Sequence, residues 1–203
     1  MALDINPSSV GYGNSIKILE DNSQITATAG DRIAKLVGSL RNFARLDEAE
    51  FQKADIHEGI NSTLILLQHE LKDKVSVVKE YGEIPEIFCY PNQLNQVFMN
   101  LFVNSAQAIE DNGTIKIETL ADNTNVYVQI SDTGKGIPAE NLDRIYEPGF
   151  TTKSSGVGTG WGLSTSYNII RKHNGEIKVE SEVGKGTEVV ITLPIKPNSM
   201  KPQ

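Results

Sequence analysis

A row of carboxamide side chains is the feature of the sequence with the clearest chemistry. Residues 92–111, NQLNQVFMNLFVNSAQAIED, contain no charged residue before Glu110, and apolar or small residues recur at spacings of three and four. That spacing predicts the core face of a helix from Gln93 to Ile109. A second stripe on this helix consists only of amides: Gln96, Asn100, Asn104 and Gln107.

These amides predict a helix face turned toward a ligand. An amide left unpaired in an apolar setting costs free energy, so a satisfied core network would explain a single asparagine. Four amides in a row favour a ligand instead. Asn104 follows Asn100 by one helical turn, so the two side chains face the same way. Their oxygens are hard, neutral ligands of the kind that Mg²⁺ accepts beside substrate phosphates.

A stretch downstream of the helix has the composition of a site for a flat ligand. A predicted strand at 126–131 continues into DTGKGIP, residues 132–138, where a carboxylate is followed by two glycines. Glycines let the chain turn and let a ligand approach the backbone. Asp132 can then accept a hydrogen bond from an exocyclic amine such as that of adenine. A plain Asp-Thr-Gly turn is the alternative.

A second glycine-rich stretch favours phosphate binding. GVGTGWGLS, residues 156–164, has a glycine at every second position and continues into a predicted helix at 161–173. Backbone amides and a helix N-terminus bind phosphate oxygens. A flexible linker is the alternative, but linkers rarely lead directly into an amphipathic helix. The sequence contains no Walker loop, no G-x-G-x-x-G and no protein-kinase catalytic loop.

The elements that must position these residues alternate in type. A helix is expected at 56–72, a short strand at 75–81, and strands with one covered face around 115–118 and 126–131. Residues 133–160 form a long glycine-rich loop with a short helix near 140–145, and such loops are usually functional. The helix at 161–173 ends at Asn174-Gly175, and strands at 176–181 and 187–194 follow. The sum is a mixed sheet with helices on one face, an α/β fold of the two-layer α+β sandwich type.

The N-terminal part has a different pattern. Residues 1–22 are expected to be a polar leader, and 23–46 carry apolar residues at alternating steps of four and three, the seam of a helical bundle or coiled coil. Packing of this helix on its own domain is the alternative. Residues 47–55 are expected to be a linker.

Composition limits the classes of function. A chain of 203 residues has room for one full domain and an additional element. The net charge of −7 argues against nucleic-acid binding. The single cysteine, Cys89, fits a reducing cytoplasm, and no signal peptide or membrane-spanning apolar run is found in the sequence. We therefore expect a cytoplasmic protein without direct membrane contact.

In this order the motifs resemble the ATP-binding domain of bacterial sensor histidine kinases, within the superfamily that includes gyrase and MutL. NQVFMNLFVNSAQAI resembles the N box, DTGKGIP the G1 box, IYEPGFTTK the F box, GTGWGLS the G2 box and GKGTEVVITLP the last box. The resemblance implies a Bergerat-type ATP-binding fold and an ATP-binding kinase domain at 51–196, followed by a tail at 197–203. GDRIAKLVGSLRNFARLDEAE resembles the second helix of the dimerisation and phosphotransfer hairpin, so 23–50 would be an incomplete part of that hairpin.

The resemblance assigns roles to individual positions. Asn104 would hold Mg²⁺ with help from Asn100, and Asp132 would bind the adenine amine. Phe150 would anchor a lid at about 138–160, and Lys153 would touch the γ-phosphate, which makes Asn100 and Lys153 the catalytic candidates. The remaining nucleotide-binding residues implied are Gly134, Gly136, Ile137 and Thr187 around the base, and Gly158, Gly160, Gly162 and Leu163 at the phosphates.

Three positions bear on the kind of reaction. Relatives that hydrolyse ATP carry a glutamate one turn before the metal-binding asparagine, and here that residue is Asn100, which cannot act as a base. Trp161 replaces a small aliphatic residue of the family, and Gln107 replaces a lysine that reaches phosphate in many members, so that phosphate contact is in doubt. The expected function is transfer of the γ-phosphoryl group of Mg-ATP to a histidine.

That histidine is not expected in this chain. The acceptor of the family lies on the first hairpin helix, and residues 1–22 contain no histidine. His57, His69 and His173 are expected to be ordinary residues, although HELK at His69 resembles an acceptor motif. Autophosphorylation of this chain alone is therefore not expected. The implied partners are a hairpin from a missing segment or a partner protomer, a response regulator, and a second copy in a homodimer. The alternatives are an ATP-hydrolysing domain of the gyrase or MutL type, a non-catalytic nucleotide-sensing dimerisation module, and a serine kinase of the anti-sigma type.

Overall fold

The computed structural model describes residues 17–26, 30, 51–152 and 160–196. Residues 17–26 form a helix, and residue 30 is helical. The helix therefore covers the end of the segment for which we expected a polar leader, where no glycine or proline interrupts the chain between 14 and 29. Most of the expected hairpin helix at 23–50 lies outside the described residues, so its structure remains a prediction.

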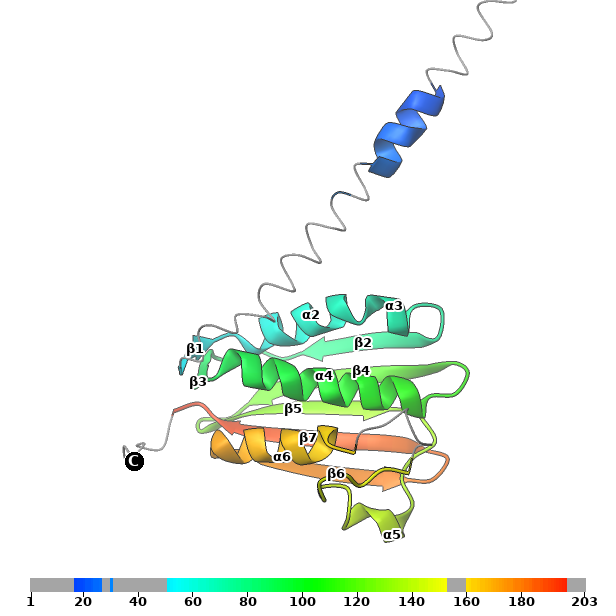
Figure 1. Cartoon of the computed structure of the whole chain (residues 1–203). Coiled ribbons are helices and arrows are strands. Elements are labelled where there is room, and N and C mark those ends of the chain that lie inside the picture. Colours follow the sequence, from blue (N-terminus) through cyan, green and yellow to red (C-terminus); the bar gives the residue numbers. More distant parts are fainter. Residues whose placement is uncertain (1–16, 27–29, 31–50, 153–159, 197–203) are drawn as a thin grey trace, which may run out of the picture. The chain divides into compact units, whose positions relative to one another are not determined.

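A five-stranded mixed sheet forms the framework of the following domain (Figure 1). Its strands are β2 (Val75–Tyr81), β4 (Gly113–Ala121), β5 (Asn125–Asp132), β6 (Glu176–Glu182) and β7 (Gly186–Pro194), in the order β2-β4-β5-β7-β6. Only β2 and β4 are parallel, and the other neighbours are antiparallel. The parallel pair is connected through α4, as expected for a crossover between parallel strands.

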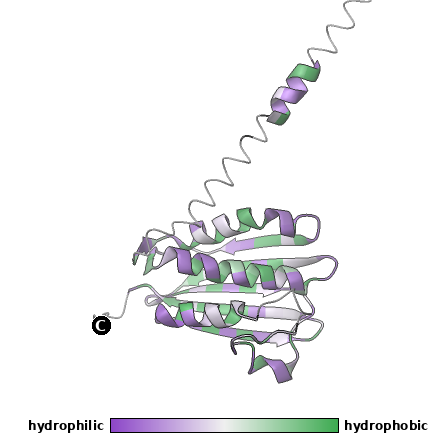
Figure 2. Cartoon of the chain, viewed as in Figure 1, coloured by the Kyte–Doolittle hydropathy of each residue, from purple (hydrophilic) through white to green (hydrophobic). Residues whose placement is uncertain are grey.

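Three helices cover one face of this sheet: α2 (Ile56–Leu66), α4 (Pro91–Ala108) and α6 (Gly162–Lys172) (Figure 1). The core lies between the two layers, where Ile117, Val128 and Ile191 are fully buried. The residues that alternate with them on β4 point away from the helices, and Lys116 forms an ion pair with Glu80 at 3.0 Å. Figure 2 shows the same mixture of apolar and polar residues along the strands. The predicted two-layer α/β sandwich is therefore confirmed.

The largest difference from the sequence analysis is a two-stranded antiparallel ribbon, β1 (Gln52–Ala54) and β3 (Ile87–Cys89). β1 lies in the segment expected to be a linker. Three residues are too few for an alternating pattern, so only the pairing between distant segments defines these strands. A smaller difference is that the expected helix at 56–72 is divided at Leu67 into α2 and α3 (Gln68–Leu71).

Capping residues explain where α2 begins and where α6 ends. α2 begins at Asp55, whose carboxylate accepts a hydrogen bond from the His57 backbone N–H at 2.8 Å. α6 ends in a Schellman motif, with Asn174 in the left-handed region at φ 56° and the Gly175 N–H donating to the Ile170 carbonyl at 2.9 Å. The predicted stop at Asn174-Gly175 is confirmed, with the asparagine as the left-handed residue. Among the described residues, no helix is long and apolar enough to span a membrane.

Candidate functional site

A cleft of about 340 Å³ lies among α4, the C-terminal end of β5, the segment that follows β5, and the start of α6. Ten of the residues predicted to bind nucleotide or metal line it: Asn100, Asn104, Asp132, Gly136, Ile137, Phe150, Gly160, Gly162, Leu163 and Thr187. Gly134 is not among the lining residues. Lys153 and Gly158 lie outside the described residues, so their roles stay predictions.

Asp132 is the one acid among the described residues that line the cleft, and it is buried, with 8% of its surface exposed. Its carboxylate accepts a hydrogen bond from the Gly134 backbone N–H at 2.9 Å, and its backbone pairs with that of Thr187. Burial raises the pKa of Asp132 above its ordinary value of 3.8, while the hydrogen bond from Gly134 opposes this shift. A buried acceptor at the end of a strand suits one specific donor of a ligand.

The two glycines after Asp132 have different functions. A Cβ on Gly134 would lie 2.7 Å from the carbonyl carbon of Ala108, so this glycine lets the turn pack against the end of α4. Gly136 has φ of 72°, and a Cβ there would meet the backbone of Glu182. Gly136 lines the cleft and Gly134 supports the turn, a distinction that spacing in the sequence does not reveal.

Ser181 connects the two turns that lie beside Asp132 in the cleft. Its hydroxyl accepts a hydrogen bond from the Ile137 N–H at 2.8 Å and lies 2.9 Å from the Thr187 hydroxyl. It also donates to the Gly186 carbonyl at 2.8 Å. The turn after β5 is thereby fixed to the turn between β6 and β7. Sequence reasoning missed Ser181, because its position in β6 gives no sign of a contact across the sheet.

Three of the four amides on α4 line the cleft, and the fourth is exposed to solvent. Asn100, Asn104 and Gln107 line the cleft, whereas Gln96 is exposed and lies outside it. The Asn100 side-chain NH₂ donates to the Gly162 carbonyl at 3.1 Å and to the Ser166 hydroxyl at 3.3 Å. Its NH₂ group thus holds the first turn of α6 against α4, and its amide oxygen is the atom suited to a cation.

The segment between β5 and α6 forms the remaining wall. It contains the short helix α5 (Ala139–Leu142), and Phe150 lines the cleft with the Arg144 guanidinium 4.5 Å from its ring centroid. The Gly149 N–H donates to the Gly160 carbonyl at 3.1 Å, and a Cβ on Gly160 would meet the Gly149 backbone. This contact joins the two sides of the predicted lid directly before α6.

The N-terminus of α6 faces the cleft through Gly162 and Leu163. A helix N-terminus presents unpaired backbone N–H groups and a positive dipole end, which favour an anion. Trp161 precedes the helix with 58% of its surface exposed and does not line the cleft.

The cleft also includes lining residues that sequence reasoning did not select: Leu101, Val103, Ala108, Lys135, Ile145, Thr151, Thr152, Val179 and Val189. Most of these are apolar residues on core-facing positions, which resemble any other core residue in sequence.

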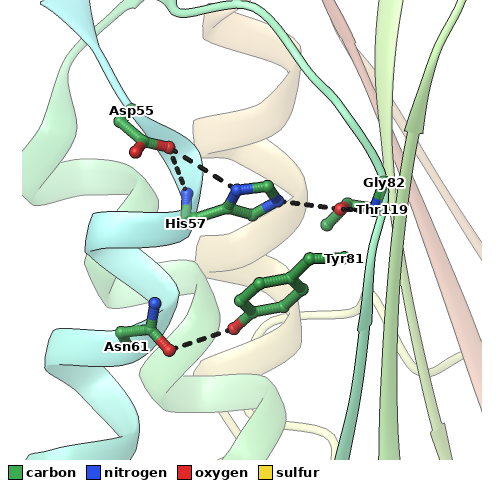
Figure 3. Close-up of polar contacts among 6 residues, drawn as sticks. All are labelled: Asp55, His57, Asn61, Tyr81, Gly82 and Thr119. Carbon is green, nitrogen blue, oxygen red and sulfur yellow. Dashed lines mark hydrogen bonds and ion pairs between the residues drawn. The ribbon is translucent and has the colours of Figure 1, made fainter.

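None of the three histidines, all of which the structure describes, lines the cleft. Figure 3 shows His57 stacked on Tyr81, with ring centroids 4.2 Å apart, and its Nε2 lies 2.8 Å from the Thr119 hydroxyl. His69 is exposed on α3. His173 is buried, and both of its ring nitrogens are used: Nε2 accepts from the Tyr90 N–H at 2.9 Å, and Nδ1 lies 2.7 Å from the Ile169 carbonyl.

The side chains of the cleft that we expect to coordinate a metal ion are neutral amides rather than carboxylates. Among the described residues, no group of three or more His, Cys, Asp or Glu side chains is placed to hold a metal ion. A cation in this cleft would therefore need anionic ligand oxygens in addition to the asparagine amides, and a nucleotide phosphate provides them. The cleft combines a buried carboxylate, apolar walls, a helix N-terminus and two amides, which together fit a magnesium-bound nucleotide.

Residues 89–197 match the family model described as histidine kinase-, DNA gyrase B-, and HSP90-like ATPase. The chain belongs to this family. Sensor histidine kinase ZraS of Escherichia coli (strain K12) is 33% identical over 183 residues, which cover 89% of this chain and 39% of that protein. Sporulation kinase E of Bacillus subtilis (strain 168) is 37% identical over 171 residues, 83% of this chain and 23% of that protein. The chain thus spans about two fifths or less of these relatives.

Solved structures agree with this assignment. The catalytic domain of histidine kinase ThkA, in a nucleotide-free form, superimposes with a TM-score of 0.67 at 30% identity and covers 74% of this chain and 99% of that chain. Full-length ShkA shares the fold, with a TM-score of 0.65 at 23% identity over 89% of this chain and 40% of that chain. The comparisons confirm the resemblance to the ATP-binding domain of sensor histidine kinases and the Bergerat-type fold.

Proposed function

We propose that the cleft binds Mg-ATP and that the domain transfers the γ-phosphoryl group to a histidine outside this chain. The single observation that carries this proposal is the convergence of Asp132, the α6 N-terminus and two amides of α4 on one cleft. Family membership supports ATP as the ligand. The relatives named as sensor histidine kinases support a protein acceptor.

In this proposal, different residues of the cleft contact the base and the phosphates of the nucleotide. The Asp132 carboxylate accepts a hydrogen bond from the adenine amine, and Gly136 and Thr187 shape the base site. The N–H groups at the start of α6 hold phosphate oxygens. Asn104, with Asn100, would hold the Mg²⁺ ion, which supplies charge neutralisation at the phosphates when it is bound.

Asn100 favours transfer to a protein over transfer to water. A neutral amide cannot accept a proton, so this position cannot activate a water molecule as a glutamate would. Phosphoryl transfer mainly needs positioning and charge neutralisation. The gyrase- or MutL-type hydrolase and the nucleotide-sensing module are therefore weaker candidates, and each predicts a different outcome in the experiments below.

The proposed partners follow from the same activity. The acceptor is a phosphotransfer hairpin, to which residues 23–50 contribute one helix, and a response regulator receives the phosphoryl group from it. We propose a homodimer in the full-length protein, because a hairpin with an apolar seam buries that seam in a bundle. We place this domain in the cytoplasm.

Calorimetry of ATP binding with and without Mg²⁺ tests the ligand. Asn104→Ala is expected to remove the effect of Mg²⁺ on affinity, whereas Gln96→Ala, an exposed amide of the same helix outside the cleft, leaves it unchanged. Labelled ATP with an added histidine hairpin then tests the reaction. Steady phosphate release without labelled hairpin would favour the hydrolase, and ATP binding with neither product would favour the sensing module.

A further inference from the structure

Lys135 is the one basic side chain among the described residues that line the nucleotide cleft. It is exposed, and no ion pair of the described residues involves it. The proposed function gives this lysine no role, because it assigns the base amine to Asp132 and the phosphates to α6 and the amides of α4. The charge of Lys135 is therefore available to another part of the ligand.

The backbone of Lys135 is held on two sides. Its N–H donates to the carbonyl of Ala108, the last residue of α4, at 2.9 Å. Its carbonyl accepts from the N–H of Gly184, in the turn between β6 and β7, at 2.9 Å. The preceding residue, Gly134, also packs closely on Ala108. The side chain of Lys135 therefore starts from a fixed backbone at the edge of the cleft, and only its stem and ammonium group can move.

Its position along α4 places Lys135 at the end of the cleft away from the α6 N-terminus. Asn100 contacts the first turn of α6 through the Gly162 carbonyl. Ala108 lies more than two turns further along α4, about 12 Å at 1.5 Å per residue. Lys135 is bonded to Ala108 and belongs to the turn that begins at Asp132. It therefore lies at the base end of the proposed nucleotide site rather than at the phosphate end.

We infer that Lys135 covers the face of the adenine ring, an inference that rests on the proposed function. The methylene groups of the lysine lie against the ring, and the ammonium group lies over it on the solvent side of the cleft. Lysine stems cover apolar surface while their charged ends stay in water, and a cation over an aromatic face is attracted by the ring. Asp132 then recognises the edge of the base, and Lys135 contacts its face.

A structural role is the alternative for the same charge. Lys135 lies at the C-terminal end of α4, and a cation near a helix C-terminus stabilises the helix through its dipole. Removal of the charge would then lower the free energy of unfolding and leave nucleotide affinity unchanged. Denaturant titration and nucleotide titration of the same variants separate the two roles.

The test is a titration of the whole chain with Mg-ATP, Mg-ADP and AMP, followed by ¹H–¹⁵N NMR so that weak binding is also measured. Lys135→Met keeps an unbranched stem and removes the charge. It is expected to weaken the binding of all three nucleotides by the same factor, about two- to fivefold. Lys135→Arg should retain the affinity, since a guanidinium also stacks on aromatic faces. Lys185→Met is the matched control, because Lys185 is an exposed lysine of the β6–β7 turn outside the cleft, and it should have no effect.

A loss of affinity that grows with the number of phosphates would place the ammonium group at the phosphates and would overturn the inference. Unchanged affinity of Lys135→Met for all three nucleotides would also overturn it, whether or not the free energy of unfolding falls. That result would leave the proposed function intact, because ATP binding by the wild-type chain and the effect of Asn104→Ala are measured separately. A wild-type chain that binds none of the three nucleotides would overturn both proposals.

Discussion

At the scale of single residues, Asp132 and Asp122 are acids with opposite effects on stability. Burial raises the pKa of Asp132, so the folded state holds its proton more tightly than the unfolded chain does. The contribution of Asp132 to the free energy of unfolding is fully present below about pH 3.8, the ordinary pKa of this carboxyl. It is lost as the pH rises through the higher pKa that the carboxyl has in the folded state. The ionised carboxylate therefore destabilises the fold at neutral pH.

Asp132→Asn is expected to raise the free energy of unfolding at pH 7 and to weaken ATP binding by about 10- to 100-fold, the usual range for a lost hydrogen bond to a charged group. Denaturant titration and calorimetry measure the two effects. Asp122→Asn is the control, because hydrogen bonds, first that of the Tyr127 hydroxyl, lower the pKa of Asp122. It should lower stability at pH 7 and leave ATP binding unchanged. Lower stability of Asp132→Asn would contradict this account.

At the scale of elements, His173 connects the end of α6 to the residue before α4. The Tyr90 N–H donates to Nε2, so the proton of the neutral ring is on Nδ1 and is donated to the Ile169 carbonyl. Burial lowers the pKa of His173 below its ordinary 6.5. The unfolded chain therefore binds a proton at a higher pH than the folded protein, and the free energy of unfolding should fall as the pH drops below about 6.5.

His173→Phe is expected to lower the free energy of unfolding at pH 7 by about 1–3 kcal/mol, because the buried Tyr90 N–H loses its acceptor. The variant should also lose part of the decrease in stability between pH 7 and 5. Denaturant titrations at both pH values measure this difference. His69→Phe is the control, since His69 is exposed on α3. An unchanged pH dependence in His173→Phe would show that other groups cause it.

The turn between β6 and β7 supports the Asp132 site through Gly186. This glycine has φ of 116°, and a Cβ there would meet the Asp132 carbonyl oxygen. Gly186→Ala is expected to destabilise the fold by more than about 2 kcal/mol and to weaken ATP binding, because backbone strain is added to a collision beneath the site. Gly184→Ala is the matched control: φ is 79° but no atom lies within 4 Å. It should cost only about 1 kcal/mol, from strain alone, with ATP affinity preserved.

At the scale of the whole molecule, the spacing of apolar residues along the sequence predicted most of the helices and strands of the domain. The apolar spacing of α4 and the alternation in β4, β5 and β7 were sufficient because each buries one continuous face. The β1–β3 ribbon could not be predicted, since three-residue strands have no period and their pairing is non-local. The same limit applies within the cleft. Asp132 and the glycines were recognisable as motifs, whereas the support by Ser181 and the packing of Gly134 on Ala108 depend on contacts between distant segments.

The positions of the histidines determine the last prediction, that the chain alone does not phosphorylate itself. His173 is buried with both ring nitrogens bonded, His57 is stacked on Tyr81, and His69 lies on α3 outside the cleft. Incubation with labelled ATP and Mg²⁺ should leave the chain without acid-labile label, while an added histidine hairpin becomes labelled under the same conditions. Acid-labile label that disappears in His69→Gln would instead identify His69 as an acceptor, because exposure alone leaves its ring accessible to a second copy of the domain. Label on the hairpin combined with an unlabelled chain would show that the kinase domain is active and that its acceptor must come from another segment.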